Sequence, residues 1–183
     1  MQRDEALELV KKHVSNPNLV KHMLATEAVM KALARHLGGD EETWGLAGLL
    51  HDVDYELTKD DATRHALVGA QMLAELGVDP DIVHAVKAHN ETLGVPRASQ
   101  MDKALFSGEA LTGLITAAAL VRPEKKLAAV TSSAVLKRFG EKAFARGANR
   151  ETIASCSELG VALPEFVEIG LVAMQSIADD LGL

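Results

Sequence analysis

Side chains that could hold a metal ion are concentrated in one short stretch, AGLLHDVDYEL, residues 47–57. In it, His51 and Asp52 are adjacent and directly follow an apolar run. Successive helical residues point about 100° apart, so these two side chains approach one point only near a helix end, with partners from other helices. A metal ion supplies such a point. Imidazole and carboxylate together suit divalent Fe, Mn, Co or Zn. The absence of cysteines near this stretch argues against a site with thiolate ligands.

The sequence has seven histidines, and their positions predict different roles. His22 lies beside the apolar stripe of its predicted helix. His13 and His36 lie among polar neighbours near predicted helix ends, so we expect both at the surface. His84 and His89 are five residues apart, about 140° round a helix, and therefore cannot face one site. We interpret His84 as structural.

The elements that must position these residues are predicted to be helices. Aromatic residues make up only 3% of the chain, and no strand alternation persists anywhere in it. Apolar spacing and capping residues predict helices at about residues 3–14 and 18–38 and a helix that runs from Asp40 into residues 47–57. Further helices are predicted from Asp60 or Asp61 to Gly77, from Asp79 onward, and from Ser99 to Val121. Three more begin at Pro123, Asn149 and Pro164, and the last of them reaches nearly to Leu183.

Length and composition favour one all-α domain. A chain of 183 residues is long enough for one core and short for two. The single cysteine, Cys156, cannot form an internal disulfide, and MQRDEALELV at the N-terminus lacks an apolar run of signal-peptide or membrane-span length. We therefore expect a cytoplasmic protein with no membrane partner. The net charge of -7 disfavours a nucleic-acid polymer and favours a small-molecule substrate.

The order of these residues resembles that of the HD-domain superfamily of metal-dependent phosphohydrolases. The resemblance covers about residues 18–120 and includes His22 in LVKHMLATEAVMKALA, the HD pair in AGLLHDVDYEL, His65 in RHALVGAQML, His89 in AVKAHNETLG, and EALTGLITA. Two letters alone are a weak signal, whereas five ordered elements are a specific one. The segment FARGANRETI is similar to the continuation seen in small bacterial HDIG-type hydrolases of unassigned substrate.

The resemblance implies a fold and a ligand set. The fold is one compact multi-helix bundle over residues 1–183, with an HD core at about 18–120 and C-terminal helices at about 123–183 packing on it. The implied metal ligands are His22, His51 and Asp52. His65 and His89 are implied either as ligands of a second metal or as substrate-binding groups, so one or two divalent ions per chain are expected.

The last implied ligand departs from the family pattern, which usually has Asp where this sequence has Glu109 in SGEALTGLITA. Glu reaches one methylene further, and Gly108 and Gly113 would allow a close backbone approach. Glu109 shares its helix face with Leu105 and Thr112, an unfavourable place for an unpaired charge. We therefore expect Glu109 to be a ligand. The alternative alignment leaves the site without its final ligand.

The implied activity is hydrolysis of a nucleotide or another small phosphate ester. A metal held by imidazoles and carboxylates lowers the pKa of bound water, and the resulting hydroxide would attack phosphorus. Asp52 is expected to orient that hydroxide. Asp54 is either a general acid or a loop-starting cap. Asn90 would bond a substrate oxygen, or serve only as a turn residue.

Basic residues are concentrated between Arg122 and Arg150. Arg138, Lys142 and Arg146 recur every fourth residue and would form one stripe on a helix. Such a stripe is either a solvated face or, if it overhangs the metal, a binding surface for substrate phosphate. We assign Arg138 and Lys142 to substrate binding as a hypothesis.

Two further classes of function stay open. Proteins with this ligand order include di-iron oxygenases, which oxidise an alcohol or a phosphonate carbon. A non-catalytic domain that holds a metal or binds a nucleotide is the other. Metal analysis with a phosphatase screen distinguishes these classes from a hydrolase.

Overall fold

The computed structural model describes residues 1–141 and 143–183, and in these residues all regular secondary structure is helical, as predicted. The α-helices among these residues are α1 (Arg3–His13), α2 (Pro17–Leu37), α3 (Glu41–Leu50), α4 (Tyr55–Thr58), α5 (Leu67–Glu75), α6 (Pro80–His89), α7 (Gln100–Leu120), α8 (Ser132–Gly140), α9 (Arg150–Ala154), α10 (Leu163–Ser176) and α11 (Ala178–Leu181). Among the described residues, each helix is too short or too polar to span a lipid bilayer.

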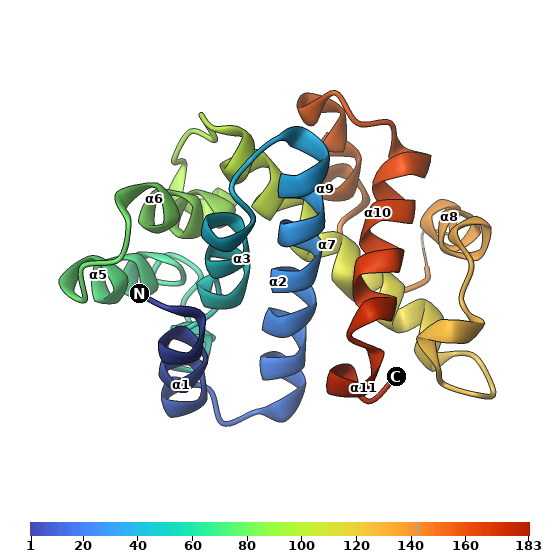
Figure 1. Ribbon diagram of the computed structural model, residues 1–183, viewed down its shortest axis with the longest axis horizontal. Coiled ribbons are helices and arrows are strands. Elements are labelled where there is room, and N and C mark those ends of the chain that lie inside the picture. Colours follow the sequence, from blue (N-terminus) through green and yellow to red (C-terminus); the bar gives the residue numbers. More distant parts are fainter. Residues whose placement is uncertain (142) are drawn as a thin grey trace.

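The two long helices, α2 and α7, pack against each other in the middle of the bundle. In Figure 1, α3, α5 and α6 lie on one side of α2, and α10 and α8 lie on the other. α7 contacts α6 on the first side and α8, α9 and α10 on the second. α2 and α7 therefore join both halves of the molecule and carry side chains into both.

Several helix starts are those that the sequence predicts. The side chains of Asp40, Asp79, Ser99 and Asn149 each accept a hydrogen bond from a backbone N–H in the first turn of their helix. Such caps satisfy N–H groups that have no partner within the helix. Ser99 and Asp102 form a reciprocal capping box at the start of α7.

The prediction of a helix from Asp60 or Asp61 is wrong, because α5 begins only at Leu67. The Asp61 carboxylate instead accepts from the backbone N–H of Thr63, which makes a turn. The backbone of Ala66 then adopts a left-handed conformation, with φ of 66°. These turns bring His65, which lies just before the helix, toward the middle of the molecule.

The prediction of a helix from Pro123 is also wrong, since α8 begins at Ser132 with Thr131 as its cap. The intervening segment is held by Gln175 of α10, whose side-chain amide donates to the carbonyl groups of Leu127 and Val130. These tertiary hydrogen bonds favour a 3-10 turn over a continuous helix. At the other end of the chain, the helix containing Pro164 stops at Ser176 and α11 follows.

Close packing of α3 on α2 depends on Gly48. A Cβ at this position would lie 2.8 Å from the backbone oxygen of Thr26 and 2.9 Å from the backbone nitrogen of Glu27. Neither backbone atom can move without shifting α2. A Cβ on Gly108 of α7 would make an ordinary contact with Val29, whereas a Cβ on Gly113 would meet only Ala148, at 3.9 Å. The expected close approach at Gly113 is therefore absent.

We expect Gly48→Ala to lower the free energy of unfolding by about 2–3 kcal/mol, because overpacking forces the two helices apart. For a chain of this size, that loss corresponds to a Tm lower by roughly 4–12 °C. Thermal unfolding followed by circular dichroism measures it. Gly113→Ala is the matched control, since its Cβ meets only Ala148 at 3.9 Å, and it should raise stability by about 1 kcal/mol. Equal Tm values for the two variants would contradict the packing argument.

Candidate metal centre

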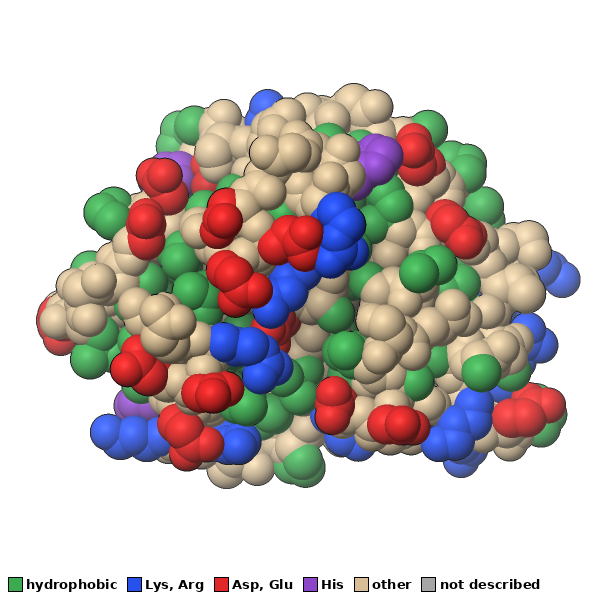
Figure 2. Space-filling view, viewed as in Figure 1, with side chains coloured by type: hydrophobic (Ala, Val, Ile, Leu, Met, Phe, Trp, Pro, Cys, Tyr) green, Lys and Arg blue, Asp and Glu red, His purple; other side chains and the backbone are tan. Residues whose placement is uncertain are grey.

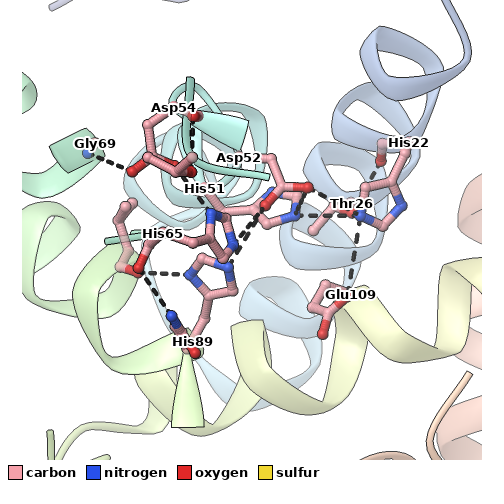
Figure 3. Close-up of polar contacts among 12 residues, drawn as sticks. His22, Thr26, His51, Asp52, Asp54, His65, Gly69, His89 and Glu109 are labelled. Carbon is pink, nitrogen blue, oxygen red and sulfur yellow. Dashed lines mark hydrogen bonds and ion pairs between the residues drawn. The ribbon is translucent and has the colours of Figure 1, made fainter. Parts of the chain in front are cut away.

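Four histidines from four segments surround the carboxylate of Asp52 (Figure 3). His22 comes from α2, His51 follows α3, His65 precedes α5, and His89 ends α6. Each presents its Nε2 atom to Asp52: the distances are 3.9 Å for His22 and 3.5 Å for His51, both to Oδ2, and 3.3 Å for His65 and 3.6 Å for His89, both to Oδ1. The two carboxylate oxygens therefore face two different histidine pairs.

The Nδ1 atom of each imidazole is already hydrogen-bonded to an oxygen. His51 Nδ1 donates to the carbonyl of Gly48 at 2.8 Å, and His89 Nδ1 donates to the carbonyl of Val86 at 2.5 Å. Both histidines lie at a helix C-terminus, where the carbonyl three residues earlier lacks a helical partner. With Nδ1–H used in this way, the lone pair of Nε2 faces the centre, as a metal ligand requires.

His22 is fixed in the same tautomer by Thr112 of α7. The Thr112 hydroxyl donates to the Glu109 carbonyl at 2.7 Å, so its oxygen accepts from His22 Nδ1 at 3.0 Å. His22 and His51 consequently bring their Nε2 atoms within 3.2 Å of each other. Two unprotonated nitrogens at this distance cannot form a hydrogen bond with each other, because neither carries a proton to donate. One metal ion between them would bind both.

Asp54 orients His65. This carboxylate is fully buried, with 0% of the residue exposed. Its two oxygens accept from His65 Nδ1 at 3.0 Å and from the backbone N–H of Gly69 at 2.7 Å. Asn90 supports the same segment, because its amide donates to the carbonyl groups of His65 and Ala62. The structure thus brings both predicted residues next to His65, and their roles in acid catalysis and substrate binding stay predictions.

Glu109 lies at the edge of the cluster. Its Oε2 is 3.9 Å from His22 Nε2, and 28% of its side chain is exposed. Burial of the carboxyl group raises the pKa of Glu109. The cluster contains two groups of three residues whose ligand atoms all lie within 4.8 Å of one another. The first group is His22, His51 and Asp52, and the second is Asp52, His65 and His89. Glu109 stands beside the first of these groups, which is where a sixth ligand is predicted.

The charges of the cluster are strongly perturbed. Burial lowers the pKa of His51 to about 3, so its imidazole is neutral. Burial alone would raise the pKa of Asp52, but the surrounding histidines, His51 first among them, hold it well below its usual range. Burial would likewise lower the pKa of His65, yet its bonds to Asp52 and Asp54 raise it to about 9.

A metal ion that binds His65 must therefore displace a proton at pH 7. We expect the affinity for this ion to increase about tenfold per pH unit up to about pH 9, with about one proton released per ion at pH 7. Calorimetry in buffers of different ionisation enthalpy counts the protons. Asp54→Asn, which removes one partner that raises this pKa, should reduce the release at pH 8. Metal uptake with no proton release at pH 7 would contradict the charge assignment.

The structure does not bring Arg138 into this cluster. Arg138 lies on α8, where its guanidinium pairs with Glu141 at 2.6 Å and lines a separate pocket with Arg122 and Lys137. Lys142 lies outside the described residues. The hypothesis that these two residues bind substrate phosphate stays a prediction. His84 Nδ1 lies 3.1 Å from Asp102 Oδ2 at the start of α7, away from the cluster.

Sequence reasoning missed two residues that touch the histidines. Thr112 was considered only as a neighbour of Glu109, and its spacing gave no signal of a bond to His22. Tyr55 directly follows the HDVD motif, and its ring packs edge-on against His65 with the ring centroids 5.5 Å apart. An exposed aromatic beside a polar motif was the available signal for Tyr55.

Comparisons with known proteins agree with this geometry. A family model described as "HD domain" matches residues 19–141. Ribonuclease Y of Oleidesulfovibrio alaskensis is 32% identical over 96 residues, which is 52% of this chain and 18% of that protein. Ribonuclease Y of Nitratidesulfovibrio vulgaris (strain DP4) is 36% identical over 74 residues, 40% of this chain and 14% of that protein. The chain thus spans less than a fifth of these relatives. No solved structure gives a significant match.

Proposed function

The chain belongs to the HD-domain family, and we propose that it is a phosphohydrolase whose site holds two divalent metal ions. Membership of this family and the cluster of histidines around Asp52 support a metal-dependent hydrolase site.

The observation that supports two ions is the division of Asp52 between two histidine pairs. One oxygen faces His22 and His51, and the other faces His65 and His89. Asp52 would therefore be a ligand in both groups, one with His22 and His51 and the other with His65 and His89. Glu109 would complete the first site. Fe, Mn, Co or Zn would each suit this set of nitrogen and oxygen donors.

The chain's own residues would do the positioning in the reaction. Divalent ions in this site would supply a lowered pKa for water and a polarised phosphoryl oxygen. Asp52 is buried but lines one pocket together with His22, and it would orient the attacking water there. Asp54 has both oxygens occupied, and it would hold His65 rather than contact the substrate.

The proposed substrate is a small phosphate ester. On the face shown in Figure 2, Lys and Arg side chains lie among Asp and Glu side chains, not in a patch of one sign. Pairs such as Arg3 with Glu27 and Arg35 with Glu41 account for part of this mixture. This face therefore gives little attraction to a polyanion. The relatives named ribonuclease Y make an RNA strand the second candidate substrate.

The test is elemental analysis of freshly purified protein, followed by a hydrolysis screen with Mn, Fe, Co and Ni. We expect about two ions per chain and release of phosphate or of an alcohol from small phosphate esters. A short single-stranded RNA in the same screen tests the second candidate. A mixed-valence iron spectrum without turnover of any phosphate ester would replace the proposal with oxygenase chemistry.

A further inference from the structure

A second cavity with charged walls, the α8 pocket, lies between the end of α7 and the helix α8 and has a volume of about 310 Å³. Its cations are Arg122, Lys137 and Arg138, and its other lining residues are Ala118, Val121, Pro123 and Ala134. Within the described chain, no acidic residue lines it. The pocket therefore combines positive charge with small apolar side chains, in a chain whose net charge is -7.

The α8 pocket is separate from the metal centre. In Figure 1, α8 lies on the opposite side of the bundle from α5 and α6, beside which His65 and His89 lie. Along α7, Ala118 follows Glu109 by nine residues, which is roughly 13–14 Å of helix. Among the described residues, none that lines the α8 pocket also lines either of two pockets that include His22. A group bound in the α8 pocket is therefore out of contact with the proposed metal ligands.

The end of α8 does not explain these cations. Basic residues in the last turn of a helix often compensate for its unpaired carbonyl groups. In α8, however, the guanidinium of Arg150 has this role, because it donates to the carbonyl groups of Arg138 and Phe139. The side chains of Lys137 and Arg138 are thus not needed to cap the helix.

Ion pairs within the protein use only one of the three cations. The guanidinium of Arg138 lies 2.6 Å from the carboxylate of Glu141, and it packs over the ring of Phe144 at 4.7 Å from the centroid. In the part of the chain that the structure describes, no carboxylate forms an ion pair with Arg122 or Lys137. Both of these charges are therefore free to bind a ligand that enters the pocket.

The charge balance around the pocket stays positive when its surroundings are counted. Arg150 adds a fourth positive charge to the three in the pocket. Against them stand Glu141 and the C-termini of α7 and α8, each of which carries about half a negative charge. The loop after Pro123 adds a further excess, since it contains two lysines and one glutamate, Lys125, Lys126 and Glu124. Cations that face one cavity repel each other, and an anion between them relieves the repulsion.

We propose that the α8 pocket binds a small molecule with two or more linked phosphate groups, separately from any ester at the metal centre. Guanidinium and ammonium groups are common protein partners of phosphate oxygens. Linked phosphates present oxygens to several cations at once, whereas a single phosphate reaches fewer. A volume of about 310 Å³ suits a small ligand, and the apolar residues would pack against its ring or alkyl group. The inference does not depend on the hydrolase function, because binding in this pocket involves no covalent step.

The experiment is calorimetric titration of metal-loaded protein with α,β-methylene adenosine diphosphate, an analogue that resists hydrolysis. This probe can also bind at the metal centre, so we expect two sites in the wild type. Arg122→Gln/Lys137→Gln removes the two cations without ion-pair partners and should weaken one site about tenfold or more, with the other unchanged. Asp52→Ala should show the converse, losing the site at the metal centre and keeping the α8 pocket.

Lys125→Gln/Lys126→Gln is the matched control. It removes the same number of positive charges from the adjoining loop, but neither lysine lines the pocket. We expect it to weaken binding by about threefold or less, because charges outside the pocket act through solvent. Adenosine monophosphate, with one phosphate group, should bind the α8 pocket more weakly than the diphosphate analogue does.

Three results would overturn the inference. They are equal weakening by the two double variants, binding that Arg122→Gln/Lys137→Gln leaves unchanged, and tighter binding of the monophosphate. The first would show that the charge of the whole segment attracts phosphate without a defined pocket. Circular dichroism checks that each variant is folded. If the double variant unfolds, Lys137→Gln at an exposed position gives the same comparison, with an expected loss of about threefold.

Discussion

Asp52→Ala is expected to leave the protein folded, to remove both metal ions, and to lower kcat/KM for phosphate ester hydrolysis by at least about 10³-fold. Both oxygens of this carboxylate face histidine pairs, so one substitution takes a ligand from each proposed site. The apolar core holds the helices independently of the cluster. Elemental analysis, circular dichroism and steady-state kinetics measure the three quantities.

Asp60→Ala is the control for Asp52→Ala, because Asp60 is an exposed carboxylate that follows α4 and has no contact with the cluster. It should keep both ions. Two alternatives have distinct signatures. An Asp52→Ala protein that keeps one ion at full affinity would show that this carboxylate serves a single site, and a protein that unfolds would show that the charge of the cluster is structural.

His89→Ala should reduce the metal content from about two ions to about one and lower kcat by about 10²-fold or more, since the second ion loses one of three protein ligands. His65→Ala should do the same. His22 and His51 keep their own hydrogen bonds in both variants, so the first site stays assembled. Metal analysis of each variant after dialysis against buffer tests the prediction.

His84→Ala is the control for these two variants, because His84 contacts Asp102 away from the cluster. It should keep both ions and full activity. A different result would be wild-type metal content and a raised KM in both His65→Ala and His89→Ala. It would indicate that these histidines bind substrate phosphate at a mononuclear site.

The sequence could predict that one cluster brings together five residues, because the family resemblance orders them along the chain. These are His22, His51, Asp52, His65 and His89. Helix ends added support: His51 and His89 each end a helix, where side chains reach past the last turn. The all-helical fold followed from composition and spacing. The capping residues placed most helix starts because a cap is a local interaction between a side chain and the next turn.

The parts that could not be predicted depend on contacts between distant residues. The segment before His65 carries a capping residue, Asp61, yet it forms turns because Asp54 and Asn90 hold His65 from elsewhere in the chain. The stretch after Pro123 is held by Gln175. Thr112 and His22 are 90 residues apart. No local pattern in the sequence encodes any of these pairs.

Two helices, α3 and α6, end at the cluster, and this shared direction has an electrostatic consequence. The dipole of a helix places about half a negative charge at its C-terminus. Together with Asp52 and Asp54, and against the single positive charge of His65, these termini give the metal-free centre a negative potential, which favours divalent cations over phosphate. We therefore expect divalent cations to bind to this centre more readily than an anionic ester does, and the ester to bind better once cations are present.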